Sequence, residues 1–262
     1  MVITFLIGGK GKSGRKNLGF EKIESKIMSE SDNFKLVEKK SKVKNIFDSI
    51  SGRYDLLNHL LSFGIDIYWR RKALKLSDIN KNSFLLDVAC GTGDVAIEAK
   101  KLGVEKIVGA DFSHNMLRLF HKKSNWIIGN NVQMVAEQMP FKDNSFTNIT
   151  VAFGVRNFYN IQEGFNSFYR VLKAQGKATI IEFQMPKNKF FAALYKFYFK
   201  KILPIIGGII SGNRSAYNYL PNSVEEFDEK VNLEILLRNS GFRRIDIYQL
   251  SFGTVQVVIA EK

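Results

Sequence analysis

The stretch that decides the fold is Asp87-Val88-Ala89-Cys90-Gly91-Thr92-Gly93-Asp94. It follows an apolar run at 84–88, which predicts a buried strand, and it opens an amphipathic segment at 94–101, which predicts a helix. The two glycines let the backbone come close to a ligand at the carboxyl edge of a parallel sheet. Asp111 lies 20 positions after Gly91, at the end of the next apolar run, where a carboxylate can accept hydrogen bonds from ribose hydroxyls. This combination predicts a site for a nucleoside cofactor.

The residues around the glycines indicate which nucleoside binds. A dinucleotide fingerprint has a third glycine where this chain has Ala96, and Asp94 in the first helical turn would repel a pyrophosphate. S-adenosylmethionine carries no phosphate but does carry an ammonium and a sulfonium, so Asp87 and Asp94 favour it. A nicotinamide dehydrogenase is the less favoured alternative. Structural roles are also open for Asp87 and Asp111 as turn carboxylates, and for Cys90 as a small buried side chain.

Beyond the loop, short apolar runs alternate with amphipathic segments, which is the pattern of a parallel sheet covered by helices. Further strands are expected at 106–110, 132–135, 146–153, 178–183, 244–250 and 254–260. Helices are expected at 113–122, capped by Ser113, at 161–172, and at 233–239, which stops at Gly241. Seven strands with a closing pair around Gly253 predict the α/β, Rossmann-like fold of class I S-adenosylmethionine-dependent methyltransferases, mostly parallel with an antiparallel terminal strand.

Two segments fall outside this alternation. After a short apolar stretch at 1–7, residues 8–45 are polar and rich in Gly, Ser and Lys, which predicts a disordered extension at 1–41 ahead of a methyltransferase domain at 42–262. Met28 offers an alternative start. Residues 188–222 form an aromatic and basic insertion, which we expect to act as a lid and to be broken by Pro204, Gly207 and Gly208. Ser223, with Glu226 three places on, predicts a capping box that opens a helix.

Composition limits the partners and the compartment. The net charge of +14 favours contact with a polyanion, either nucleic acid or an anionic membrane surface, although it equally fits a lysine-rich, solvated surface. A single cysteine permits no intrachain disulfide, and no apolar run approaches a membrane span, so a cytoplasmic location is expected. The three histidines show no metal-ligand spacing, so no metal site is expected.

Longer stretches outside the loop resemble the UbiE-type quinone methyltransferase family over about residues 42–261. The matching stretches are Tyr54-Asp55-Leu56-Leu57-Asn58, Leu61-Ser62-Phe63-Gly64, Trp69-Arg70, Phe153-Gly154-Val155-Arg156-Asn157, Arg170-Val171-Leu172-Lys173, Glu182-Phe183 and Tyr217-Asn218-Tyr219-Leu220-Pro221-Asn222-Ser223-Val224. Departures are few: the chain has Asp66 where the family often has His, Ala174-Gln175 for Pro-Gly, Val135 for a small polar or acidic residue, and Ala152 for Ser. The absence of that serine removes one side-chain bond to the cofactor that the family would predict.

The resemblance implies transfer of a methyl group from S-adenosylmethionine to a ring carbon of a reduced polyprenyl quinone precursor. It implies that Thr92, Asp111 and the backbone near Ala136 contact the cofactor, together with the loop residues Asp87, Gly91 and Gly93. The stretch Ser62-Phe63-Gly64-Ile65-Asp66 resembles the bacterial menaquinone enzymes, which convert demethylmenaquinol to menaquinol, more than it resembles the ubiquinone enzymes. A ubiquinone precursor is the open alternative.

For the chemistry we expect Arg156 and Asn157 to bind the ring oxygens, with Arg156 favouring the phenolate. Tyr54 would close over the cofactor or relay the phenolic proton. Arginine stays charged and is a poor direct base, so the proton is expected to leave through water. Each has a structural alternative: an ion pair at a strand end for Arg156, and packing for Tyr54.

The aromatic and basic insertion suggests a further partner. Its aromatic residues recur at near-helical spacing beside lysines, which suits a helix in the interface of an anionic membrane, where it could admit an isoprenoid tail. A plain lid packed over the active site is the alternative.

A nucleic-acid methyltransferase is the main rival class. Methylation of a base amino group usually calls for an Asn/Asp-Pro-Pro-aromatic run at the end of the fourth strand, where this chain has Ala152-Phe153-Gly154-Val155. Methylation of cytosine at C5 needs a nucleophilic cysteine, and Cys90, the single cysteine, lies in the cofactor loop. No nucleic-acid partner is therefore expected. A binding protein on a decayed methyltransferase domain is a second rival, opposed by the intact loop and Asp111.

Overall fold

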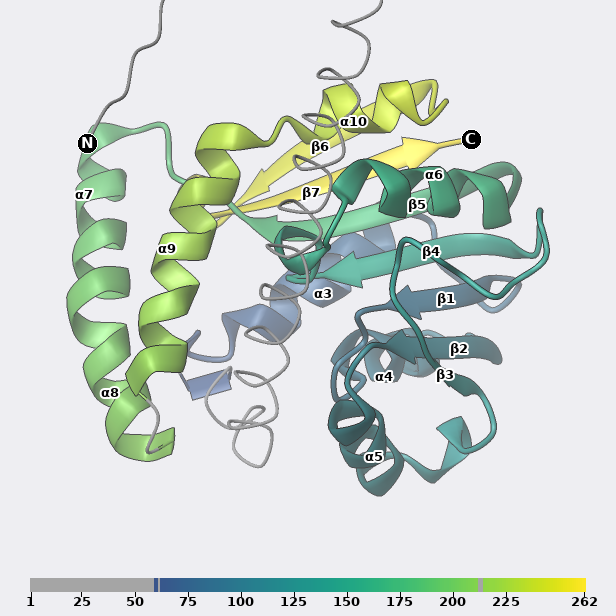
Figure 1. Ribbon diagram of the computed structural model, residues 1–262, viewed down its shortest axis with the longest axis horizontal. Coiled ribbons are helices and arrows are strands. Elements are labelled where there is room, and N and C mark those ends of the chain that lie inside the picture. Colours follow the sequence, from purple (N-terminus) through teal and green to yellow (C-terminus); the bar gives the residue numbers. More distant parts are fainter. Residues whose placement is uncertain (1–58, 61, 212–213) are drawn as a thin grey trace, which may run out of the picture. The chain divides into compact units, whose positions relative to one another are not determined.

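The computed structural model describes residues 59–60, 62–211 and 214–262, so the predicted extension at 1–41 lies outside the described residues. The sheet has seven strands in the order β3-β2-β1-β4-β5-β7-β6 (Figure 1). Its strands are β1 (Phe84–Val88), β2 (Lys106–Asp111), β3 (Asn131–Gln133), β4 (Phe146–Ala152), β5 (Leu172–Phe183), β6 (Arg244–Leu250) and β7 (Val255–Glu261).

The sheet is parallel except at one end. The strands β3, β2, β1, β4 and β5 pair in parallel, while β7 is antiparallel to both β5 and β6. The central strands are largely buried on both faces because helices cover both faces of a parallel sheet. The predicted fold class is confirmed, including the antiparallel terminal strand.

Two strand boundaries differ from those expected from sequence. The third strand ends at Gln133 rather than 135, because β3 is an edge strand that pairs with β2 at only three positions and Val135 then turns into a pocket. The fifth strand starts at Leu172 rather than 178. Leu172 pairs with Phe146, and the register between β4 and β5 then shifts. This irregularity accommodates the polar residues that follow Leu172.

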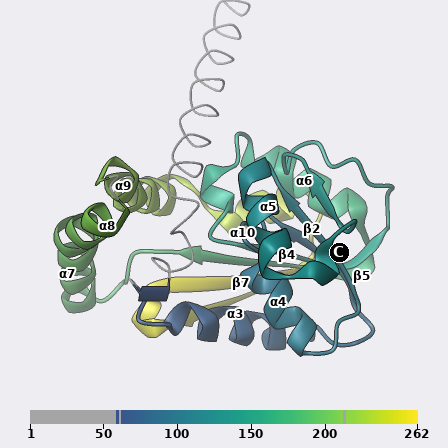
Figure 2. The same cartoon turned by 90° about the horizontal axis from the view of Figure 1, so that it is seen from below.

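Helices from both sides complete the core. On one face, α3 (Ile65–Leu76), α4 (Asp94–Lys101) and α5 (His114–Lys123) bury Leu74, Val95 and Phe120. On the other, α6 (Ile161–Val171) and α10 (Leu233–Asn239) bury Phe165, Phe168 and Leu237. Figure 2 shows α3 and α4 on the opposite side of the sheet from α6 and α10. Because β1, β2, β4 and β5 are parallel, their carboxyl ends meet at one edge of the sheet. Ligand sites form at this edge in folds of this kind.

The predicted insertion is a helical layer that stands off this edge, toward which the arrows of β1, β4 and β5 point (Figure 1). It consists of α7 (Lys189–Phe197), the π-helical turn η4 (Tyr198–Ile202), α8 (Leu203–Ser211) and α9 (Arg214–Lys230). We call these elements the lid helices.

The expected break at Pro204, Gly207 and Gly208 is wrong, since all three lie inside α8. The π-helical turn before Pro204 already departs from α-helical hydrogen bonding, and that departure accommodates a proline. The apolar packing of Phe199 and Leu203 against Leu220 then outweighs the low helix propensity of the glycines.

The capping box at Ser223 is also wrong, because α9 begins earlier, at Arg214. Ser223 lies mid-helix and its hydroxyl donates to the carbonyl of Leu220 at 2.9 Å, a bond typical of serine inside a helix. By contrast, Ser113 does cap α5, accepting from the Met116 amide. No helix among the described residues is long and apolar enough to cross a membrane.

Candidate active site

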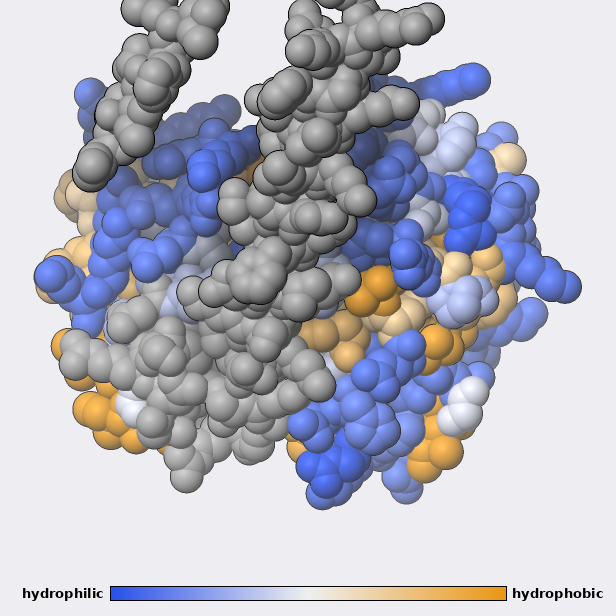
Figure 3. Space-filling model, in the orientation of Figure 1, coloured by the Kyte–Doolittle hydropathy of each residue, from blue (hydrophilic) through white to orange (hydrophobic). Residues whose placement is uncertain are grey.

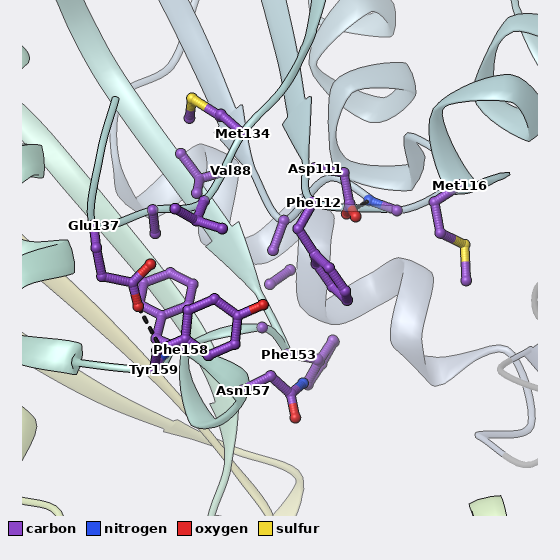
Figure 4. A pocket seen from close by; sticks show the side chains of 16 residues that line it. Val88, Asp111, Phe112, Met116, Met134, Glu137, Phe153, Asn157, Phe158 and Tyr159 are labelled. Atoms are coloured by element: carbon purple, nitrogen blue, oxygen red, sulfur yellow. Dashed lines mark hydrogen bonds between the residues drawn. The ribbon is translucent and has the colours of Figure 1, made fainter. Parts of the chain in front are cut away.

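A pocket of about 660 Å³ lies at the carboxyl edge of the sheet (Figure 4). It is lined by the ends of β1, β2 and β4, the segment after β3, and the short helix η3 (Val155–Asn157). The lining residues are Val88, Ala89, Gly91, Asp111, Phe112, Met116, Met134, Val135, Ala136, Glu137, Ala152, Phe153, Gly154, Asn157, Phe158 and Tyr159. Its largely apolar wall, with a few polar groups, suits a small organic ligand.

The glycine loop has the backbone shape that only small residues allow. Gly93 has φ +88°, and a Cβ on it would lie 2.1 Å from the ring of Phe120. Gly154, at the end of β4, would place a Cβ 2.7 Å from that of Ala89. These glycines therefore let two loops and a helix come together closely around the pocket.

Asp111 is held rigidly at the pocket wall. One carboxylate oxygen accepts from the Gly91 amide at 2.8 Å, and the other accepts from the Ser113 amide at 2.8 Å. The residue is only 5% exposed, yet it borders the pocket. Sequence reasoning thus located this carboxylate correctly at the sheet edge, and the Gly91 contact ties it to the glycine loop.

Asp87 is buried under the loop and does not line the pocket. One carboxylate oxygen accepts from the Thr150 hydroxyl at 2.7 Å, while Oδ2 has no partner among the described residues. Burial raises the pKa of Asp87 from its ordinary 3.8 to about 7, against the opposing influence of the Thr150 hydroxyl and the nearby Ala96 amide. The group is thus poised between its neutral and charged forms at physiological pH.

The charge of Asp94 is neutralised by protein cations. Its carboxylate lies 3.3 Å from Arg70 and also pairs with Lys123. Arg70 reaches back to Asp66 at 2.5 Å, which in turn accepts from His59 at 2.8 Å. The structure therefore uses Asp94 to tie the cofactor loop to α3 and α5, a role that the sequence argument about cofactor charge did not anticipate.

Carboxylate and imidazole groups of His59, Asp66 and Asp94 lie within 4.8 Å of one another. Such a set can hold a metal ion, but here the guanidinium of Arg70 bonds to both acids and already supplies the positive charge. This cluster is therefore a structural ion network.

Of the other predicted cofactor residues, Ala136 lines the pocket and Thr92 does not. Thr92 is 3% exposed and lies at the start of α4, between the two loop glycines. Glu137, beside Ala136, borders the pocket and accepts from the amides of Tyr159 and Asn160 at 2.7 and 3.0 Å. Sequence reasoning missed Glu137, Phe112 and Tyr159, although the first two directly follow predicted contact residues.

The predicted catalytic residues take different positions. Asn157 lines the pocket, and its Oδ1 accepts from the Tyr219 hydroxyl of α9 at 2.9 Å. Arg156 faces away from the pocket: its guanidinium donates to Glu182 at 2.6 Å and to the Phe153 carbonyl at 2.6 Å. Tyr54 lies outside the described residues.

The ion pair of Arg156 and Glu182 is almost fully enclosed. Side-chain exposure is 7% for Arg156 and 0% for Glu182. Glu182 also accepts from the backbone amides of Arg156 and Phe183. A paired and multiply bonded charge of this kind rigidly fixes the turn after β4, and with it the adjacent Asn157.

Cys90 is not equipped for nucleophilic chemistry. Burial, with the neighbouring carboxylate of Asp111, raises the pKa of its thiol well above the usual value. Since the thiolate is the nucleophile, this cysteine stays inert at neutral pH. Chemistry through a covalent cysteine intermediate is therefore not supported.

The residues around the pocket fit S-adenosylmethionine. Figure 4 shows Asp111 and Phe112 beside each other on one wall, where a carboxylate suits ribose hydroxyls and an apolar surface suits a flat base. Met134 and Ala136 extend that apolar surface. The buried Oδ2 of Asp87, beneath the loop, has no partner among the described residues.

Comparison with solved structures identifies the fold. An S-adenosylmethionine-dependent methyltransferase from Thermotoga maritima superposes with a TM-score of 0.60 at 17% identity, covering 83% of this chain and 99% of that one. A second, described as putative, from Methanococcus maripaludis has a TM-score of 0.58 at 19% identity, covering 81% and 91%. The chain therefore has the fold of these S-adenosylmethionine-dependent methyltransferases.

Comparison of the amino-acid sequence identifies the family. Residues 35–262 match the ubiE/COQ5 methyltransferase family, and the chain belongs to that family. It is 44% identical over 235 residues to the ubiquinone/menaquinone biosynthesis C-methyltransferase UbiE of Geotalea uraniireducens, covering 87% of this chain and all of that protein. It is 42% identical over 230 residues to the demethylmenaquinone methyltransferase of Chlorobaculum tepidum, covering 85% and 93%. The family resemblance of the sequence motifs is thus confirmed.

Proposed function

We infer that this enzyme methylates a ring carbon of a reduced polyprenyl quinone precursor, converting demethylmenaquinol to menaquinol. The observation that carries the inference is the match over essentially the full length of enzymes named for this reaction, such as that of Chlorobaculum tepidum. The pocket agrees with it, because Asn157 brings a polar group to the boundary between the cofactor pocket and the lid helices.

The reaction needs a nucleophilic ring carbon. Loss of a phenolic proton raises the electron density at the neighbouring carbon of the hydroquinone. S-adenosylmethionine supplies a methyl group whose bond to sulfur breaks with the electron pair staying on sulfur. The ring carbon gains the methyl group and then releases its own proton, which restores the aromatic ring. The protein must hold the ring in line with the methyl group and keep water away.

We assign cofactor binding to the residues around the glycine loop. Asp111 accepts from the ribose hydroxyls, and the backbone at Ala136 meets the base. Gly91, Thr92 and Gly93 shape the loop around the methionine portion, and Asp87 beneath it favours the cationic end. The rigid bonds of Asp111 to two backbone amides support its part of this assignment.

We assign acceptor binding to Asn157, with Arg156 beside it. The Oδ1 of Asn157 is already occupied by Tyr219, which leaves its amide group to donate to a ring oxygen. Arg156 contributes as a nearby positive charge rather than by direct contact, because Glu182 and a carbonyl hold its guanidinium. The proposed roles of Tyr54, in closing the site or relaying a proton, fall on a residue outside those described.

The lid helices also carry a surface suited to an anionic membrane. Figure 3 shows apolar residues along the margin where α7 and α8 lie. The exposed apolar side chains there include Phe190 (73%), Leu194 (57%), Phe197 (58%), Ile205 (50%) and Ile209 (78%). Exposed lysines accompany them, namely Lys187, Lys189 and Lys201. A surface of this kind would bring the site to a lipid-dissolved acceptor, and sedimentation with phosphatidylglycerol against phosphatidylcholine vesicles tests it.

A ubiquinone precursor is the second candidate acceptor, because the Geotalea relative is named for both quinones. Purified enzyme with methyl-labelled S-adenosylmethionine is offered reduced demethylmenaquinone or a reduced ubiquinone precursor, and label is followed into the lipid extract. We expect label in menaquinone, strongly reduced by Asn157→Ala while calorimetry still detects cofactor binding. Cofactor binding without label in either lipid would refute the quinone assignment and redirect the search to RNA.

A further inference from the structure

The space between the lid helices and the turn after β4 contains two buried donors without acceptors. The hydroxyl of Tyr195 and the Nε of Arg156 are closed off from solvent, and neither has a hydrogen-bond partner among the described residues. An unsatisfied buried donor costs about 1 to 3 kcal/mol, so proteins keep few of them. Two such donors near one site of chemistry indicate an acceptor that arrives with a ligand.

Packing holds the Tyr195 hydroxyl in this space. The ring of Tyr195 stacks on Phe199, one helical turn on, with centroids 4.1 Å apart. Phe199 packs edge-on against Phe183 at 5.7 Å, at the end of β5. Tyr195 as a residue is half-buried, while its hydroxyl oxygen is closed off from solvent.

The charged groups that act on Tyr195 come from three separate elements. They are Arg156 of η3, Glu182 of β5 and Asp228 of α9. Burial is the largest influence and, with the two acids, raises the pKa of Tyr195 well above its usual value despite Arg156. The hydroxyl therefore keeps its proton and can only act as a donor to an incoming oxygen.

Tyr219 connects this space to the cofactor pocket. It lies close enough to Arg156 and Glu182 for both to influence its pKa, and it donates to Asn157 on the pocket wall. Arg156 and Glu182 also influence Tyr195, so the hydroxyls of Tyr195 and Tyr219 both lie near this ion pair. Glu182, the nearby acceptor, is already bonded to Arg156 and two backbone amides.

We propose that Tyr195 is a further catalytic residue, whose hydroxyl donates a hydrogen bond to a ring oxygen of the acceptor and stabilises its phenolate form. This assignment rests on the proposed function. A donor in a site closed to water stabilises an oxyanion more than water does, because it needs no reorganisation as the charge develops. The phenolic proton leaves to water, since Tyr195 retains its own, and the ring carbon then attacks the methyl group as described above.

The test compares wild type, Tyr195→Phe and the matched control Tyr198→Phe across the pH range of activity. Phenylalanine keeps the stacking on Phe199, and thermal unfolding checks that the fold is kept. Tyr198 lies on the same lid, and burial raises the pKa of its hydroxyl as well. We expect kcat of Tyr195→Phe at neutral pH to fall about 10- to 100-fold, the effect of one hydrogen bond to a charged group. The acid limb of its pH–activity profile should move up by about one to two pH units, and activity should recover at high pH. Tyr198→Phe should keep kcat within about twofold of wild type.

A second measurement tests directly whether the Tyr195 hydroxyl donates to a bound phenolate. Ultraviolet titration of 1-naphthol bound to wild-type enzyme should show a pKa below that of free naphthol, and Tyr195→Phe should lose most of that difference. An unmoved acid limb in an active Tyr195→Phe enzyme, or bound naphthol with the pKa of free naphthol in wild type, would overturn the proposal. Failure of wild type to label menaquinone would refute the proposed function instead, and the naphthol titration would still decide the role of Tyr195.

Discussion

The substitution Asp87→Asn tests how the fold treats the buried acid beneath the cofactor loop. Asp87 is 1% exposed, accepts one hydrogen bond from Thr150, and has a carboxylate oxygen without a partner among the described residues. Its pKa is raised from 3.8 to about 7, mainly by burial. Asparagine has nearly the same shape and can still accept from Thr150, but it carries no charge at any pH.

The direction in which stability changes with pH follows from proton binding. Between about pH 4 and 7 the folded chain holds a proton on Asp87 that the unfolded chain has lost, so stability falls as pH rises through this window. The gap between 3.8 and 7, at about 1.4 kcal/mol per pH unit, gives about 4 kcal/mol in total. About 3 kcal/mol of that is lost between pH 5 and pH 8. Above the folded pKa both states are ionised, and the contribution no longer changes.

Urea unfolding of wild type and Asp87→Asn at pH 5 and pH 8 measures this contribution. We expect the variant to gain about 3 kcal/mol relative to wild type on going from pH 5 to pH 8. Asp143→Asn, at a side chain that is 65% exposed, is the matched control and should leave the difference between the two pH values unchanged. Equal pH dependence in wild type and Asp87→Asn would show that this carboxyl ionises in the folded protein as it does in the unfolded chain, and would refute the reasoning.

Three further substitutions probe the loop and the turn after β4. Gly93→Ala should cost about 2 to 4 kcal/mol in urea unfolding, because the new Cβ meets Phe120 at 2.1 Å and φ is +88°; an unchanged midpoint would contradict it. Glu182→Gln should cost about 3 to 5 kcal/mol by leaving the Arg156 guanidinium buried without a counter-charge, and a loss below about 1 kcal/mol would argue that water reaches the pair. Asp111→Asn should weaken S-adenosylmethionine binding in calorimetry about 10- to 100-fold, whereas unaltered affinity would remove Asp111 from the cofactor site.

The geometry of the turn after β4 suggests how acceptor and cofactor are brought together. Arg156 and Asn157 are adjacent in sequence, yet one bonds to the sheet and the other reaches the pocket. The ion pair with Glu182 anchors the turn, and the bond from Tyr219 orients the amide of Asn157. The lid helices thereby contribute directly to the arrangement of the site, in addition to covering it.

Local patterns predicted most of the sheet and the cofactor loop. The predicted strands matched β1, β2, β4, β6 and β7 to within about a residue. The clearest signals were in β1 and β7, where burial selects a largely apolar sequence. The Ser113 cap and the end of α10 before Gly241 depend only on neighbouring residues, and both were found. The lid was the failure: its proline and glycines indicate breaks, yet packing against α9 and the end of β5 keeps the segment helical.

The sequence by itself determined the class of fold, the position of the cofactor loop and the acid at the end of β2, because each depends on residues within one strand–turn–helix unit. Only the tertiary structure decided that Arg156 pairs with Glu182, that Asp94 is neutralised by Arg70 and Lys123, and that Tyr219 bonds to Asn157. These partners lie 24 to 62 positions apart, so no local pattern selects among the acids, bases and hydroxyls that could pair. Their pairing follows from the order of the strands and from the packing of the helices and the lid, which bring those side chains together.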